Sequence, residues 1–139
     1  MTPPVTLERL QAWLDAPPFQ QWLGLRAVAL DPAAGTVTLR LPFRPAFQRA
    51  VDRPEIHGGV TAALIDIAGD YALAVQLGGG VPTIDLRIDY LRMAVETDLT
   101  ATARAVKTGR TIGVVDVEVR DGEGRLVAIG RGSYSTRQA

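Results

Sequence analysis

The sequence contains no cysteine and only one histidine among its 139 residues. The missing cysteines exclude a disulfide framework, a thiol nucleophile and the common structural zinc sites. One histidine is too few for a multi-histidine metal site within one chain. The 15 basic and 15 acidic side chains balance to zero net charge, which argues against a general nucleic-acid binder because such proteins need excess positive charge. A small basic cluster that holds one polyphosphate ligand stays compatible with this balance.

Targeting signals and membrane spans are also not expected. The first residues show no positive segment followed by an apolar run, which argues against a secretory signal. No stretch is expected to reach the ~20 apolar residues of a membrane span. We therefore predict a cytoplasmic protein without a membrane partner. Hydrophobic residues make up 47% and charged residues 22% of the chain, a composition typical of an ordinary globular domain.

The hydrophobic pattern predicts one domain over residues 1–139, with an N-terminal helical segment (1–23) and a core (24–139). Thr6 is the expected N-cap of a first short helix. An apolar segment over 59–77 predicts a buried helix that Gly78 ends. Alternating residues predict strands over 25–30, 36–41, 82–92, 98–107, 112–120 and 126–135. The stretch 42–56, which contains three prolines, is predicted to be irregular. This order predicts an α+β fold in which an antiparallel sheet wraps around one long central helix.

Chemistry-bearing residues gather on this central helix. Gly58 and Gly59 follow His57 at its head, where a helix leaves its first N–H groups unpaired and its dipole end positive. Such donors suit an oxyanion, and glycines there also permit close packing. Asp66 lies further along, and a buried carboxylate needs a partner or a function. It can act as a general base or as a nucleophile, or it can pair with a buried donor.

The spacing between these groups has a geometric consequence. Gly58 and Asp66 are eight residues apart on one helix, which corresponds to about 12 Å along its axis. Reacting groups must approach one carbonyl carbon to about 3 Å. If both residues are catalytic, Asp66 must work with Gly58 of another chain, so the spacing predicts a site at a subunit interface. Asp70, one turn beyond Asp66, is expected to make polar pairing or interface contacts.

Two sequence stretches carry a family resemblance. Residues 57–66 read HGGVTAALID and residues 83–92 read TIDLRIDYLR. Together with a weaker match at Gly109-Arg110 and Gly130, they resemble the PaaI-like (phenylacetate-type) acyl-CoA thioesterases of the hotdog fold, over roughly 25–136. The resemblance implies hydrolysis of acyl-CoA to free acid and CoA without metal or cofactor, by a homodimer or a dimer of dimers.

The resemblance also implies roles for individual residues. Gly58 would supply an oxyanion-hole amide, Asp66 the catalytic carboxylate, and Thr83 a hydroxyl that helps to place water or the carboxylate. Gly59 would contact the substrate, and His57 would chiefly orient the turn. The CoA phosphates would bind near the strand after the helix and near the Gly-Arg turn, with these candidate residues: Arg92, Lys107 and Arg110.

One position departs from the family pattern. Many members carry Asn or Gln about six or seven residues before the motif, where this chain has Val51. The departure leaves open which group contacts the substrate carbonyl or the lytic water, and Gln48 and Arg53 are candidate substitutes.

The aromatic residues and two rival functions complete these predictions. Phe43 and Phe47 precede the motif and are expected to contact the acyl group, whereas Trp13 and Trp22 are expected in the core. A hotdog hydratase or dehydratase is an alternative, although its Asp-x4-His pattern is absent. A non-catalytic acyl-CoA-binding protein is another, although some 24 residues before the first strand are too few for a DNA-binding domain.

Overall fold

The structure, a computed structural model, describes residues 3–137. Its elements follow the predicted order, and each predicted strand is confirmed with ends that differ by no more than two residues. The central helix begins one residue earlier than predicted. The elements are α1 (Leu7–Asp15), α2 (Pro18–Leu23), β1 (Arg26–Asp31), β2 (Thr36–Leu41), η1 (Pro45–Phe47), β3 (Gln48–Ala50), β4 (Arg53–Ile56), α3 (Gly58–Leu77), β5 (Thr83–Tyr90), β6 (Leu99–Thr108), β7 (Ile112–Arg120) and β8 (Leu126–Ser135).

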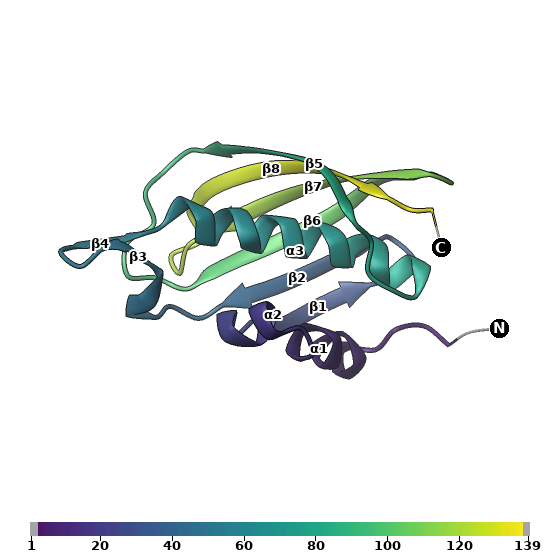
Figure 1. The fold of residues 1–139 in the computed structure, drawn as a ribbon, viewed down its shortest axis with the longest axis horizontal. Coiled ribbons are helices and arrows are strands. Elements are labelled where there is room, and N and C mark those ends of the chain that lie inside the picture. Colours follow the sequence, from purple (N-terminus) through teal and green to yellow (C-terminus); the bar gives the residue numbers. More distant parts are fainter. Residues whose placement is uncertain (1–2, 138–139) are drawn as a thin grey trace.

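Six strands form one antiparallel sheet in the order β1-β2-β6-β7-β8-β5. The long helix α3 lies across one face of this sheet, while α1 and α2 lie beside β1 at its edge (Figure 1). Each strand alternates side chains between its two faces, so one face can cover the apolar helix while the other meets solvent. The predicted α+β architecture, a hotdog fold with an antiparallel sheet around one central helix, is confirmed.

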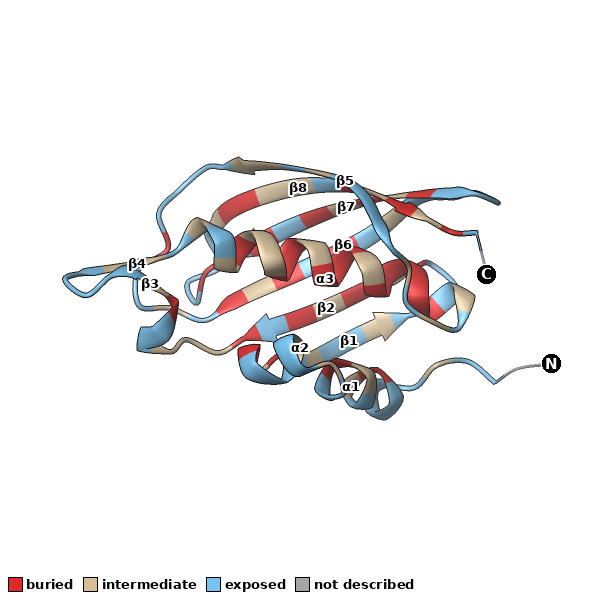
Figure 2. Cartoon of the chain, viewed as in Figure 1, coloured by how far each residue is buried: buried red, intermediate tan, exposed pale blue. Residues whose placement is uncertain are grey.

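Helix α3 forms the centre of the core. Most of its residues from Leu64 to Val75 are buried (Figure 2). By length and composition it is also apolar enough to cross a membrane, so the expectation that no stretch would reach this length was wrong. Gly78 ends the helix with a left-handed backbone (φ 90°), a conformation that glycine adopts without steric cost.

The sheet register places the two ends of β5 at opposite ends of the fold. Thr83 pairs with Tyr134 near the end of β8, and Tyr90 pairs with Ala128 near its start. Gly113, next to the β6–β7 turn, also pairs with Tyr134. The β6–β7 turn therefore lies at the Thr83 end of β5, and Tyr90 lies at the other end.

The two edges of the sheet differ in how they are covered. At the β1 edge, the side chain of Gln11 on α1 accepts from the Ala27 N–H (2.7 Å) and donates to the Leu25 carbonyl (3.0 Å). In the described part of the chain, no strand pairs with the outer side of β5. Ile84 on β5 is 57% exposed. An edge strand with unpaired backbone groups and exposed apolar side chains is a template for pairing with another chain.

Two expectations were wrong. The stretch 42–56 is not irregular throughout, because it contains η1 and a short hairpin of β3 and β4. Trp22 is not a core residue, because it is 50% exposed and its ring lies against Arg44, whose Cζ is 4.6 Å from the ring centroid. Trp13 is half-buried and stacks on Tyr71 with a centroid separation of 6.2 Å.

Candidate active site

The Asp66 carboxylate is half-buried on α3 and receives two hydroxyl groups. Thr83 donates to its Oδ1 at 2.7 Å. The Tyr134 hydroxyl lies 3.0 Å from the Asp66 carbonyl and 3.4 Å from Oδ1. Burial, followed by the nearby Asp66 and Asp70 charges, raises the pKa of Tyr134. Its phenol therefore stays protonated at neutral pH and serves as a donor beneath the carboxylate.

Glycines make room for this tyrosine between helix and sheet. A Cβ on Gly69 of α3 would collide with the Tyr134 hydroxyl, and a Cβ on Gly132 of β8 would lie 2.5 Å from the Tyr134 ring. A Cβ on Gly130 would lie 2.7 Å from the Cγ2 of Ile65 on the helix. These glycines let α3 approach β8 closely, and this approach brings Tyr134 under Asp66.

The head of α3 presents one unpaired amide. His57 is the N-cap, and its Nδ1 accepts from the Gly59 N–H at 2.8 Å, so the proton of the neutral ring resides on Nε2. The Gly58 N–H has no acceptor within residues 3–137. Tyr90 on β5 donates to the Gly58 carbonyl at 2.7 Å. The Gly58 N–H is thus free to donate to a bound group, whereas the Gly59 N–H, which was predicted to contact the substrate, is already used by His57.

A cavity of about 410 Å³ opens beside this amide. Gly58, Thr61 and Tyr90 contribute to its wall, together with Arg49, Glu55, Ile56, Leu91, Arg92, Met93, Ala94 and Val127. Gln48 and Arg53, the candidate substitutes for the family amide, do not line it. Val51 is fully exposed in the turn between β3 and β4.

The two predicted acyl-contact residues differ in accessibility. Phe43 is half-buried, and its backbone N–H donates to Asp98 Oδ1 at 2.7 Å. Phe47 is 0% exposed and packs edge-on against Trp22, with a centroid distance of 5.6 Å. The expectation that Phe47 contacts the acyl group conflicts with this burial, because a core side chain presents no surface to a substrate.

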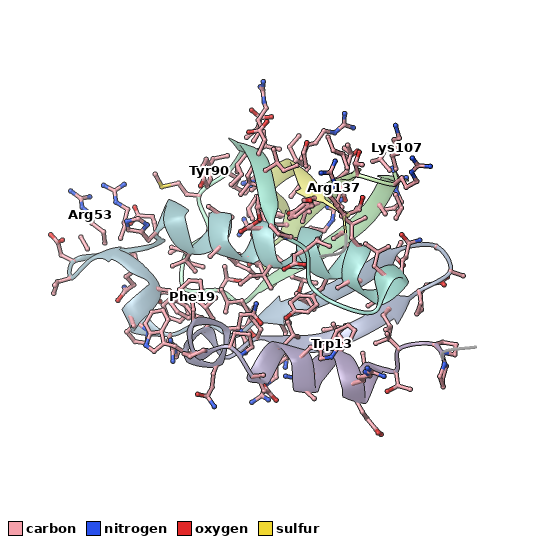
Figure 3. All side chains as sticks on the ribbon, turned by 45° about the vertical axis from the view of Figure 1, so that its right-hand side comes forward. Trp13, Phe19, Arg53, Tyr90, Lys107 and Arg137 are labelled. Atoms are coloured by element: carbon pink, nitrogen blue, oxygen red, sulfur yellow. The ribbon has the colours of Figure 1, made fainter. Side chains whose placement is uncertain are left out.

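The three predicted phosphate-binding cations do not converge within one chain. Arg92 follows β5 and lines the cavity at Gly58. Lys107 lies next to the end of β6, and Arg110 lies in the β6–β7 turn, at the Thr83 end of the sheet. Figure 3 shows Lys107 at the opposite end of the molecule from Arg53, which begins β4.

Asp70 is the second carboxylate on this part of α3. Its Oδ1 accepts from the Val81 N–H at 2.8 Å. Burial raises its pKa to about 6 against the opposing effect of the Val81 hydrogen bond, and the Asp66 charge raises it further. In residues 3–137, no arginine, lysine or histidine nitrogen forms an ion pair with it. The predicted polar pairing of Asp70 is confirmed, with a backbone amide as its partner.

The raised pKa of Asp70 predicts a pH-dependent stability. The folded state holds this proton more tightly than the unfolded chain, so between pH 3.8 and about 6 only the unfolded state loses it. Stability therefore falls as pH rises through this window, by up to about 3 kcal/mol for a shift of two pKa units. Asp70→Asn removes the titration, so its unfolding free energy relative to wild type should rise between pH 4 and pH 7.

Urea unfolding of wild type and variant at fixed protein concentration measures this difference. Asp31→Asn is the matched control, because Asp31 also accepts backbone N–H groups, from Ala33 and Ala34, but is exposed in the β1–β2 turn. It gives the pH dependence that follows from replacing an exposed carboxylate that accepts backbone N–H groups. An unfolding free energy of Asp70→Asn that does not change relative to wild type between pH 4 and pH 7 would contradict the raised pKa.

Two residues of the site were missed by sequence reasoning. Tyr134 and Tyr90 come from ordinary strand patterns that give no sign of a role. The signal for Tyr134 lay in the glycines: one in the middle of a helix and two in alternate positions of a strand indicate close backbone approach. Within the described residues, no group of three or more His, Asp or Glu side chains is arranged to hold a metal ion.

Comparison with known proteins gives consistent matches. The family model for the thioesterase superfamily matches residues 55–128. The acyl-coenzyme A thioesterase PaaI of Escherichia coli is 32% identical, with 79% of this chain and 76% of the relative covered. Human acyl-coenzyme A thioesterase 13 is 28% identical, with 89% of each chain covered. The solved structure of E. coli PaaI superimposes with a TM-score of 0.82 at 26% identity, covering 95% of this chain and 92% of that one.

Proposed function

Because this chain belongs to the PaaI-like group of the thioesterase superfamily and is a thioester hydrolase, we propose that it hydrolyses acyl-CoA thioesters at a site shared between two subunits. Asp66 of one subunit and the Gly58 amide of the other act on one thioester. The free Gly58 N–H at the head of α3 is the observation that carries this proposal.

The chemistry follows from these two groups. The Gly58 amide, at the positive end of a helix, donates to the oxygen that gains negative charge during attack on the thioester carbonyl. Asp66 either removes a proton from the attacking water or attacks the carbonyl itself. The CoA thiol, with a pKa near that of cysteine, about 8.5, departs as thiolate without an acid. Thr83 holds the Asp66 carboxylate in place through its hydroxyl.

Pairing of two β5 strands supports a shared site. Thr83 at the start of β5 bonds to Asp66, and Tyr90 at its end bonds to Gly58. Two open edge strands that pair antiparallel about a two-fold axis set the start of one against the end of the other. If the axis passes near the middle of β5, Thr83 lies opposite Tyr90 of the second chain. Asp66 then approaches the second chain's Gly58, whereas its own lies about 12 Å away along the helix.

The same pairing supports a shared phosphate site. Arg92 lies beyond the Tyr90 end of β5, and Lys107 and Arg110 lie at the Thr83 end. Antiparallel pairing of β5 strands brings the Arg92 end of one chain toward the Lys107 end of the other. Cations that are separate within one chain would then flank one groove and bind the CoA phosphates from two sides.

Complementation between two defective chains tests the shared site. Gly58→Pro removes the donor amide and little else, since proline is favoured at the first helical position and His57 already has the extended backbone (φ −59°, ψ 131°) that a residue before proline adopts. Loss of one oxyanion donor should lower kcat by about 10²–10³-fold. Asp66→Asn removes the other half of the site.

Mixed dimers of the two variants, isolated through two different affinity tags, hold one intact site and one doubly defective site. Thiol release from acyl-CoA should recover to about half of the wild-type rate per dimer. Mixed dimers as inactive as both parents would place Gly58 and Asp66 of the same chain at one site and contradict the proposal.

A further inference from the structure

Two hydrogen bonds tie the start of β5 to helix α3. Asp70 Oδ1 accepts from the Val81 N–H at 2.8 Å, and Asp66 Oδ1 accepts from the Thr83 hydroxyl at 2.7 Å. The two carboxylates are one helical turn apart and thus on one face of α3. Val81, whose N–H binds Asp70, lies two residues before Thr83, whose hydroxyl binds Asp66. The Asp70 contact therefore lies directly beside the one that orients Asp66.

The segment before β5 has few other attachments. Gly78, Gly79 and Gly80 carry no side chains, and a Cβ on Gly78 or Gly79 would meet nothing within 4 Å. Besides the helix cap at Gly78, the described residues hold this segment through the backbone bond from the Ser135 N–H to the Pro82 carbonyl (2.9 Å) and through packing of the half-buried Val81 against the core. The Asp70 side chain adds a hydrogen bond from the helix that carries Asp66 to the backbone just after the three glycines.

We propose that Asp70 is a positioning residue for the hydrolysis. It holds Val81 so that Thr83 orients the Asp66 carboxylate, and its negative charge strengthens Asp66 as a base. The inference rests on the proposed role of Asp66. Asp70 is not a second catalytic carboxylate, because its oxygen is engaged by a backbone amide and it is largely buried.

The groups around Asp70 leave its negative charge free to act on Asp66. The titratable groups that interact with it are Asp66 and Tyr71 on α3 and Tyr134 on β8, and the two phenols have raised pKa values because of burial. With both tyrosines neutral and no cation paired to Asp70 in residues 3–137, its charge acts on Asp66 without compensation. A proton on Asp70 therefore weakens Asp66, and its loss above about pH 6 strengthens it.

Two substitutions separate the two parts of this role. Asp70→Asn keeps an oxygen for the Val81 N–H and removes the charge. Its kcat should match wild type at pH 5 and fall about tenfold below it at pH 8, since the substitution removes a negative charge one helical turn from Asp66. Asp70→Ala also removes the acceptor, so its kcat should be lowered at both pH values with KM unchanged.

A double variant tests whether Asp70 acts through Thr83. At pH 5, where Asp70 is protonated, Thr83→Val should lower kcat, and adding Asp70→Ala should lower it little further because the two residues act in one chain of contacts. Asp31→Asn, at the end of β1, should have the wild-type pH profile, because the Asp31 carboxylate accepts from the Ala33 and Ala34 N–H groups and not from Val81. Urea unfolding of each variant shows that the measured protein is folded.

The outcomes are distinct. A ratio of wild-type to Asp70→Asn kcat that stays flat from pH 5 to pH 8, or an Asp70→Ala kcat equal to wild type, overturns the proposal while leaving the proposed function intact. Additive effects of Thr83→Val and Asp70→Ala overturn the route through Thr83. Failure of the proposed function gives a different result. An Asp66→Asn variant that hydrolyses acyl-CoA at the wild-type rate would rule out a role for Asp66 and, with it, the proposed role of Asp70.

Discussion

Asp66→Asn is expected to lower kcat for acyl-CoA hydrolysis by about 10²–10⁴-fold, the usual contribution of a positioned base or carboxylate nucleophile. The substitution keeps the size of the side chain, and the amide oxygen can still accept from Thr83. The Tyr134 contact with the Asp66 carbonyl is also preserved. Stability should therefore change little while the rate collapses, and KM should stay close to the wild-type value.

Thiol release from aryl- and medium-chain acyl-CoAs, followed with a thiol reagent, measures the effect. Asp31→Asn is again the matched control and should hydrolyse at the wild-type rate, because its carboxylate accepts only from the amides of its own turn. Hydrolysis by Asp66→Asn within a few-fold of wild type would rule out Asp66 as the catalytic carboxylate.

Single turnover in H₂¹⁸O separates the two roles that remain open for Asp66. If Asp66 attacks the carbonyl, water cleaves the resulting anhydride, and ¹⁸O can enter the Asp66 carboxylate. If Asp66 acts as a general base, the label enters only the released acid. Mass spectrometry that finds ¹⁸O in the peptide containing Asp66 identifies nucleophilic attack by Asp66.

Ile84→Asp is expected to convert the protein to monomers and to abolish hydrolysis to a degree similar to Asp66→Asn. Ile84 is 57% exposed on β5, the open edge of the sheet. A charged side chain on an edge strand opposes pairing with another chain. A monomer retains both Gly58 and Asp66, but they lie about 12 Å apart along one helix and cannot act on one carbonyl.

Val28→Asp is the matched control for this prediction. Val28 is 49% exposed on β1, at the opposite edge of the sheet, where Gln11 already occupies backbone groups. This variant should stay dimeric and active. Light scattering gives the mass in solution, and the thiol assay gives the rate. An Ile84→Asp monomer with the wild-type rate would refute the shared site.

The pattern of apolar residues was sufficient to predict the helix and the sheet. The segment 59–77 is apolar on nearly every face and ends at a glycine, so burial and a boundary at Gly78 followed directly. The alternation in the last three strands and their tight turns likewise fixed their limits, since side-chain period and turn chemistry are local properties.

Long-range packing decided what the pattern did not reveal. The β3–β4 hairpin carries one proline and two arginines instead of alternating apolar residues, so its pairing depends on the chain around it. Trp22 is exposed because Arg44 lies against its ring. The position of Tyr134 under Asp66 depends on Gly69 of α3 and on Gly130 and Gly132 of β8, two segments that are far apart in the sequence. The occupation of the Gly59 amide depends on the rotamer of His57.

Gln11 has a consequence for how large an assembly can grow by joining sheets. Its amide group takes the place of a neighbouring strand at Leu25 and Ala27, so this end of the β1 edge is closed to a second chain. In the described residues, no strand pairs with the outer side of β5, so β5 is the more open edge. The proposed pairing of two β5 strands would use the more open edge of each molecule, which disfavours further growth of the sheet into fibres.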